Sequence, residues 1–172
     1  GLNDNYDEKN SHVVPALIRK LYLAKLLEQG EKDAVVLNLN VSSFEEAQNH
    51  LNSFGVTSER VAIWGNGKPM REFLHVDDMA DACLHVMQHF DFKDVRSNNT
   101  EVRNTHLNIG TGKGLSVLEA VQCFEKVNNT KINYQIGPRR DGDVEEIFSD
   151  NTKVEKLLNW KAEISLEQAM QD

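Results

Sequence analysis

The sequence predicts an α/β fold in which helices alternate with short strands. Apolar residues recur at helical spacing in several segments, and most of these segments open on a polar residue that can cap a helix. Between them lie short runs of β-branched and aromatic residues bounded by Gly, Pro, Asn or Asp. The 172 residues fall within the roughly 100 to 200 residues of a typical domain. We therefore expect one compact unit.

Two helices are predicted in the first third of the chain. The first covers 10–30, with a proline near its first turn and a glycine as its stop signal. The second covers 43–55 and opens with the Ser-x-x-Glu spacing of a capping box, Ser43 and Glu46. It lies on an otherwise polar stretch from about 31 to 60, which we interpret as a helical insertion.

The middle of the chain predicts a strand, a turn, a second strand and a helix. Val61–Trp64 and Glu72–Val76 have strand-like composition, and the glycine-rich turn Gly65–Pro69 separates them. The apolar helical pattern that follows has two acidic residues at its start. We expect Asp77 or Asp78 to cap that helix.

The remainder repeats the alternation of strands and helices after a polar loop at 91–105. The predicted elements are a strand at 106–110, a turn, a helix opened by the Ser116 and Glu119 capping box, a strand at 132–136, a loop, a strand at 145–150, a helix at 151–160 and a last helix opened by Ser165 and Gln168.

Composition argues against several partners. The net charge of −8, from 27 acidic and 19 basic side chains, repels nucleic-acid phosphates and anionic lipid. No apolar run approaches the roughly 20 residues that span a bilayer, and the chain does not open on a signal-peptide pattern. Cys83 and Cys123 fall in helical stretches, where we expect buried, reduced thiols. The expectation is a cytoplasmic protein that binds neither nucleic acid nor membrane.

Two arginine-containing segments are candidate anion sites. Arg71 follows the glycine-rich turn, and a guanidinium is the usual partner of a phosphate or carboxylate, although its spacing fits a solvated side chain equally well. The segment "RRDGD" at 139–143 adds a glycine that allows close backbone approach and carboxylates that can accept ribose hydroxyls. It too fits a solvated loop.

The other polar candidates have weaker patterns. His75, Asp77 and Asp78 run from a strand into a helix start, where aspartates cap backbone N–H groups, so we predict no metal site. The turn in "NIGTGKG" lacks the spacing of a phosphate-binding loop. His12 lies at a helix start, where it is either an exposed polar residue or a proton donor at the edge of a cleft.

Two long motifs carry a resemblance to a known family. "NDNYDEKNSHVVPALIRK" (3–20) and "WGNGKPMREFLHVDDMADAC" (64–83) resemble the GDP-L-fucose synthases, extended short-chain dehydrogenases/reductases that act on nucleotide sugars. "NIGTG" continues the pattern, and Ser-His-Val within the first motif separates these synthases from the sugar epimerases. From about Gly114 the chain is more similar to UDP-glucose 4-epimerases, with their Arg-x-Gly-Asp loop and Leu-x-Trp-Lys.

The resemblance assigns roles to individual positions. His12 matches the general acid of the epimerisation steps and lies near the nicotinamide cofactor in the family. Lys20 stands where the family usually has a substrate-binding arginine, and Arg19 beside it offers a guanidinium instead. The substrate-binding positions implied in this way are Arg19, Lys20, Trp64, Arg71, Arg140, Asp141 and Asp143.

The resemblance also implies what the chain belongs to. The family's glycine-rich phosphate turn, catalytic Ser and Tyr-x-x-x-Lys do not occur in this sequence. We therefore expect residues 1–172 to form the C-terminal substrate-binding domain, with the Rossmann half that binds most of the NADP absent and the chain alone inactive. The implied reaction converts GDP-4-keto-6-deoxy-D-mannose to GDP-L-fucose in a homodimer of the full-length protein. The alternatives are a fragment of a UDP-glucose 4-epimerase and a stand-alone nucleotide-sugar-binding module.

Overall fold

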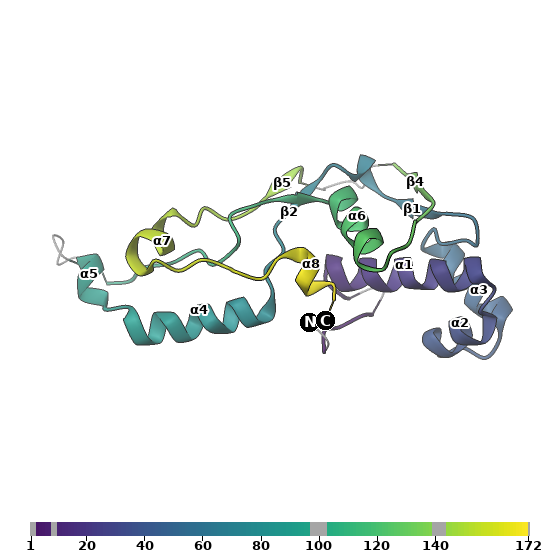
Figure 1. The fold of residues 1–172 in the computed structure, drawn as a ribbon, viewed down its shortest axis with the longest axis horizontal. Helices are drawn as coiled ribbons and strands as arrows, with labels where there is room; N and C mark the ends of the chain where they lie inside the picture. Colours follow the sequence, from purple (N-terminus) through teal and green to yellow (C-terminus); the bar gives the residue numbers. More distant parts are fainter. Residues whose placement is uncertain (1–2, 8–9, 97–102, 139–143, 172) are drawn as a thin grey trace.

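The computed structural model describes residues 3–7, 10–96, 103–138 and 144–171. Helices alternate with short strands, which confirms the predicted α/β class (Figure 1). The elements in chain order are α1 (Val13–Gln29), α2 (Lys32–Leu39), α3 (Phe44–Ser53), β1 (Val61–Ile63), the 3₁₀ turn η1 (Gly65–Gly67), β2 (Met70–Arg71), α4 (Val76–His89), α5 (Phe92–Arg96), β3 (Leu115–Ser116), α6 (Val117–Val127), β4 (Tyr134–Ile136), β5 (Glu146–Ile147), α7 (Thr152–Leu158) and α8 (Leu166–Ala169).

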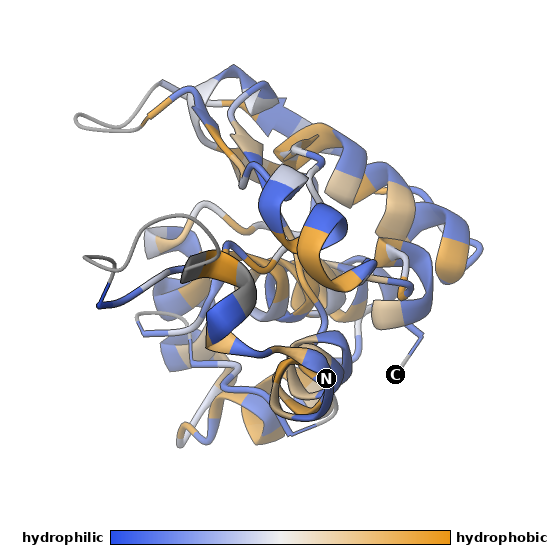
Figure 2. Cartoon of the chain, turned by 90° about the vertical axis from the view of Figure 1, so that its left-hand side faces the viewer, coloured by the Kyte–Doolittle hydropathy of each residue, from blue (hydrophilic) through white to orange (hydrophobic). Residues whose placement is uncertain are grey.

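The molecule is elongated, and most of its helices lie toward one end or the other, with α8 (Leu166–Ala169) between the two groups (Figure 1). Helices α1, α2, α3 and α6 lie at one end, α4, α5 and α7 at the other, and β2 and β5 lie between them (Figure 1). Along the helices, apolar and polar residues are interspersed, as expected of helices that bury part of their surface (Figure 2). Each end has its own apolar cluster, a large one around α1 and a small one between α4 and α7.

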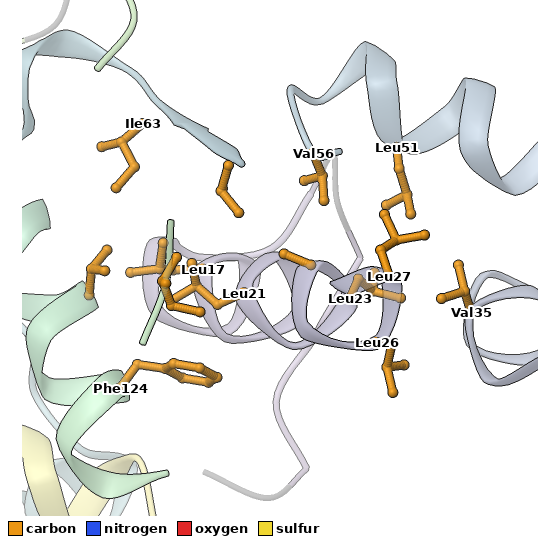
Figure 3. Close-up of a cluster of buried hydrophobic side chains, with 14 of the residues drawn as sticks. Leu17, Leu21, Leu23, Leu26, Leu27, Val35, Leu51, Val56, Ile63 and Phe124 are labelled. Atoms are coloured by element: carbon orange, nitrogen blue, oxygen red, sulfur yellow. The ribbon is translucent and has the colours of Figure 1, made fainter. Parts of the chain in front are cut away.

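Helix α1 is the centre of the larger cluster. Its buried side chains face β1 on one side, α6 on another and the α2–α3 pair at its C-terminal end (Figure 3). Leu21 is fully buried, and Phe124 of α6 packs in the same cluster. Gly30 ends the helix in the left-handed conformation at φ 78°, as the stop signal predicts. The first predicted helix is therefore confirmed.

The stretch 31–60 contains two helices, where the sequence predicted one on a polar segment. Helix α2 was missed because its N-cap, Glu31, makes no side-chain capping bond and gives no local signal. Its Val35 is nevertheless fully buried, and Leu51 of α3 is buried in the same cluster. These helices therefore contribute to the core around α1. Whether they are an insertion relative to the family stays a prediction.

The predicted capping boxes form largely as expected. At the starts of α6 and α8 both reciprocal bonds are present, around Ser116 and Ser165. At α3 the Ser43 hydroxyl accepts the Glu46 N–H at 3.2 Å, but the Glu46 carboxylate accepts the N–H of Ser42. Three helix starts were thus predicted from local sequence alone.

The strands form two small sheets. β1 pairs in parallel with β4, and β2 is the centre of a second sheet, antiparallel to β3 and parallel to β5. The predicted strand 72–76 is wrong, because the pairing stops at Arg71 and His75 is already the N-cap of α4. The His75 Nδ1 accepts the N–H of Asp77, so the cap is the histidine and the aspartates belong to the first turn. Within the described residues, 106–110 does not pair as a strand either.

A single carboxylate joins the three strands of the second sheet. Glu72 directly follows β2, and its Oε1 accepts the N–H of Gly112 at 2.6 Å while its Oε2 accepts the N–H of Ser149 at 2.9 Å. The hydroxyls of Thr111 and Ser149 lie 3.2 and 3.0 Å from Oε1. Burial alone would raise the pKa of the Glu72 carboxyl, but the bonds from Ser149, Gly112 and Thr111 outweigh it and lower the pKa.

The start of α4 is tied to the segment that links α7 to α8. The Asp78 carboxylate accepts the N–H groups of Glu163 and Ile164, at 3.1 and 3.0 Å. The indole N–H of Trp160 donates to Asp81 at 2.8 Å. Both cysteines are free thiols. Cys83 is exposed on α4 and Cys123 is only partly buried on α6, which corrects the expectation that both are buried. No described helix is both long and apolar enough to cross a bilayer.

The burial of Leu21 predicts a large loss of stability when it is truncated. We expect Leu21→Ala to lower the free energy of unfolding by about 2 to 5 kcal/mol, because it removes buried methyl groups and leaves a cavity. Leu37→Ala is the control, since Leu37 is 82% exposed, and it should change the free energy by less than about 0.5 kcal/mol. Urea unfolding of both variants measures the difference, and equal losses would contradict the assigned core.

The Glu72 interactions predict a specific pH dependence. The carboxyl's pKa is lowered in the folded state, so its contribution to stability is present above its ordinary pKa and is lost as the pH falls through the folded value. We expect Glu72→Gln to lower the melting temperature at neutral pH and to make its fall between about pH 7 and about pH 3 shallower than in the wild type. Circular dichroism measures the melting temperature of both proteins at several pH values. If Glu72 did not contribute, the two curves of melting temperature against pH would run parallel.

Candidate functional site

A pocket opens between α1 and the β1–η1–β2 segment. Its volume is about 360 Å³, which falls in the range of about 300 to 1,000 Å³ for small-molecule sites. The floor is apolar, with side chains from α1, β1 and the end of α3, and its polar lining comes from Ser11, Lys20, Trp64 and Arg71. Three of the residues predicted to contact substrate, Lys20, Trp64 and Arg71, therefore line one pocket.

Tight backbone packing positions Trp64. It precedes η1, in which Gly65, Asn66 and Gly67 all have positive φ, between 55° and 71°. A side chain at Gly67 would overlap Leu118 of α6, so only glycine lets this turn lie against the helix. On its other side, the backbone of Gly137 approaches the indole so closely that a Cβ there would be 3.3 Å from Trp64 Cε3.

Arg71 is held at the pocket wall by carbonyl groups. Its Nη1 donates to the carbonyl oxygens of Met70 and Val144, both at 2.8 Å. The side chain is half-buried, so these contacts fix the plane of the guanidinium. The turn and strand that precede this residue thus place a planar, permanently charged fork in the pocket lining.

Lys20 reaches the same pocket from helix α1. Its Nζ donates to the carbonyl oxygen of Ala62 in β1 at 2.7 Å. None of the described residues that line the pocket is acidic. In a chain with a net charge of −8, this pocket therefore combines two cations with an apolar floor, an arrangement that attracts an anion with an apolar or planar group.

Arg19 is not brought to the pocket. Its guanidinium donates to the carbonyl of Tyr6 and to the side chain and carbonyl of Asn38, at 2.8 to 3.1 Å. It therefore joins the N-terminal segment to the end of α2. Consecutive residues of a helix point about 100° apart, so Lys20 and Arg19 serve different surfaces.

His12 lies at the edge of the pocket. It is the exposed N-cap of α1, and its neighbours Ser11 and Val13 line the pocket while it does not. Ser11 was not predicted as a site residue, and its Oγ is buried and has no hydrogen-bond partner among the described residues. Its only signal was the Ser-His-Val motif. The predicted residues Arg140, Asp141 and Asp143 lie outside the described part of the chain.

No metal centre is formed in the described ranges, where no three His, Cys, Asp or Glu residues are placed to hold an ion. The neighbours His75 and Asp77 are instead joined at the helix N-terminus, with 3.8 Å between Nδ1 and the carboxylate. At the pocket, the side chains of Lys20 and Arg71 can bind an anion, the Trp64 indole can stack on a planar group, and the imidazole of His12 lies at the edge.

Comparison with known proteins identifies the family. A family model described as GDP-mannose 4,6-dehydratase matches residues 24–172. The chain is 34% identical to the GDP-L-fucose synthase of Escherichia coli (strain K12) over 167 residues, which are 97% of this chain and 42% of the relative. It is 40% identical to UDP-glucose 4-epimerase 2 of Oryza sativa subsp. japonica over 107 residues, 62% of this chain and 25% of the relative.

A solved structure extends the match to the fold. A GDP-D-glycero-L-gluco-heptose synthase from Campylobacter jejuni, determined in the presence of NADPH, superimposes with a TM-score of 0.88 at 36% identity over 99% of this chain and 48% of that one. The chain thus spans less than half the length of the relatives it matches. It belongs to the GDP-mannose 4,6-dehydratase family of nucleotide-sugar enzymes, within the extended short-chain dehydrogenases/reductases, and corresponds to their C-terminal part.

Proposed function

We propose that this chain binds the nucleotide sugar in an NADP-dependent epimerase/reductase that acts on a GDP-linked 4-keto sugar. The observation that carries the proposal is the pocket lined by Lys20, Trp64 and Arg71. A nucleoside diphosphate sugar combines a pyrophosphate, which two cations can hold, with planar and apolar groups that an indole and an aliphatic floor can contact. The specific reaction proposed converts GDP-4-keto-6-deoxy-D-mannose to GDP-L-fucose.

Each residue of the pocket has a distinct role in this proposal. The guanidinium of Arg71, oriented by two carbonyl groups, would bind the diphosphate through two parallel hydrogen bonds. The ammonium of Lys20 would add a point charge without that geometry.

His12 is the proposed proton donor in the epimerisation steps. It is exposed at the N-terminus of α1, at the rim of the pocket and between two lining residues, and in this proposal its imidazole donates a proton to a sugar ring bound inside. A general acid must approach the reacting carbon within hydrogen-bond distance, directly or through one water. NADPH supplies the hydride for the ketone reduction, as its presence with the related heptose synthase supports.

A second, dinucleotide-binding half is the proposed partner of α4. Five side chains at helical spacing form an exposed stripe on this helix: Val76, Met79, Cys83, Leu84 and Met87. Met87 alone is 81% exposed, and contiguous apolar surface of this kind marks an interface. The alternating residues of 106–110 also have no strand partner in the described part, so a sheet edge of the partner could extend along them.

A UDP-glucose 4-epimerase-like activity is the second candidate. The 40% identity to the rice epimerase over 107 residues exceeds the identity to the fucose synthase, and the Arg-x-Gly-Asp sequence at 140–143 supports it. The Ser11-His12-Val13 motif and the longer match to the fucose synthase favour the first candidate. The free thiols of Cys83 and Cys123 suit the cytoplasm proposed for either enzyme.

Substitution of Arg71 tests the proposed diphosphate contact. In the protein as its gene encodes it, we expect Arg71→Ala to weaken binding of the preferred nucleotide by about 2 to 5 kcal/mol, because a charge-assisted contact is lost. Arg71→Lys should recover only part, since a point charge cannot replace the planar fork. Calorimetric titration of GDP and of UDP measures both variants and shows which base is preferred.

Arg60→Ala is the matched control, because Arg60 is an exposed arginine just before β1 and does not line this pocket. It should bind nucleotide as the wild type does. Unchanged affinity in Arg71→Ala, with an unchanged melting temperature, would overturn the diphosphate site.

Substitution of His12 tests the proposed proton transfer. We expect His12→Gln to retain nucleotide-sugar affinity within about threefold and to lose epimerisation, because a proton donor acts mainly on the transition state. Incorporation of solvent deuterium into the sugar, followed by mass spectrometry, reports the step directly. Incorporation at the wild-type rate would show that another residue donates the proton.

A further inference from the structure

The strand that carries Arg71 is too short to hold its neighbours by backbone pairing alone. β2 consists of Met70 and Arg71, and each residue pairs once with β3 and once with β5. Directly after it, the Glu72 carboxylate accepts a backbone N–H from the Thr111–Gly112 turn before β3 and another from Ser149 after β5. A side chain therefore continues the cross-strand bonding at the point where the backbone pairing ends.

The same segment that binds Glu72 also orients Arg71. Val144, whose carbonyl accepts the Arg71 Nη1, lies just before β5, and Ser149, whose N–H binds Glu72, lies just after it. Two consecutive residues thus hold residues 144–149 at both ends. Arg71 binds the carbonyl of Val144, and Glu72 binds the N–H of Ser149. The two-residue β2–β5 pairing holds the same segment, and the bond from Ser149 to Glu72 attaches it again beyond the end of that pairing.

The surroundings of Glu72 leave little freedom for another arrangement. A Cβ on Gly110 would lie less than 3.0 Å from both the Ser149 hydroxyl and the Glu72 carboxylate, so the three residues are in close contact. The Ser149 hydroxyl is also 2.7 Å from Asn151 Oδ1, and the Asn151 amide donates to the Gly110 carbonyl at 2.7 Å. These bonds connect the carboxylate to the start of α7.

We propose that Glu72 is a positioning residue, whose carboxylate locks residues 144–149 against β2 and thereby holds the Arg71 guanidinium at the wall of the pocket. Its effect on ligand binding rests on the proposed function. Its effect on the orientation of Arg71 does not rest on the proposed function and can be measured without a ligand.

Glu72→Gln is the informative change because it keeps the shape of the side chain. A carboxylate accepts the Gly112 N–H on one oxygen and the Ser149 N–H on the other, whereas an amide has one oxygen and turns an N–H toward the remaining donor. Glu146→Gln is the matched control, because Glu146 is an exposed glutamate of the same sheet and pairs with Met70 through its backbone.

The first measurement is the guanidinium spectrum of Arg71. The protein as its gene encodes it is labelled with ¹⁵N-arginine, and Arg71→Lys identifies the signal. We expect a resolved Arg71 Nη resonance in the wild type and in Glu146→Gln, because the bond to Val144 slows rotation of the group. In Glu72→Gln the resonance should be averaged or broadened. A resonance unchanged by Glu72→Gln, in a variant with a lowered melting temperature, would show that Glu72 only stabilises the fold.

The second measurement is nucleotide affinity in a double-mutant cycle, well below the melting temperature of each variant. We expect Glu72→Gln to weaken binding about tenfold when Arg71 is present and to have little further effect in Arg71→Ala, because it acts through that residue. Equal effects in both backgrounds would overturn the proposal. Absence of nucleotide binding in the wild type would reject the proposed function and leave the guanidinium spectrum to decide the role of Glu72.

Ser149→Ala provides a milder variant if Glu72→Gln does not fold. It removes one hydroxyl beside the carboxylate and keeps both backbone N–H bonds. The Arg71 resonance should broaden in the same direction but to a smaller degree, and an unaltered resonance in this variant would count against the proposal.

Discussion

Helix α1 has to be buried on several sides at once, and this requirement determines where everything else at its end of the molecule lies. Leucines occur around much of its circumference, so one neighbour cannot cover them, and β1, α6 and the α2–α3 pair each take a part. Lys20 lies on this helix, and its ammonium donates to the carbonyl of Ala62 in β1. A cation thereby comes to the edge of the core, which is where the pocket opens.

The success of the fold predictions depended on whether the physical interaction was local. The capping boxes at Ser116 and Ser165 are themselves the interactions that start α6 and α8, so a four-residue pattern sufficed to find them. Strand pairing depends on distant segments, which explains why 72–76 and 106–110 were wrongly predicted as strands although their composition is strand-like. Helix α2 gave no cap signal, and only its packing on α1 explains it.

Part of the candidate site could be predicted, because some of its residues lie in local sequence motifs. Motifs around Trp64 and Arg71 marked residues that do line one pocket with Lys20. Arg19 and Lys20 lie on different faces of α1, and the motif does not indicate which of these faces lines the pocket. The bonds made by Glu72 join segments about 40 and 77 residues apart in sequence. No local sequence pattern indicates such contacts, so they could be identified only from the three-dimensional structure.

The close contact at Gly110 constrains how this sequence can drift over evolutionary time. Any side chain at that position would occupy the space of the Glu72 carboxylate and the Ser149 hydroxyl. A change at 110 is therefore tolerated only together with a shorter or displaced residue at 72 or 149. The close contact therefore couples substitutions at these three positions, although they lie far apart in the chain. A substitution of Glu146, whose side chain is exposed on the neighbouring strand, meets no such constraint from Gly110.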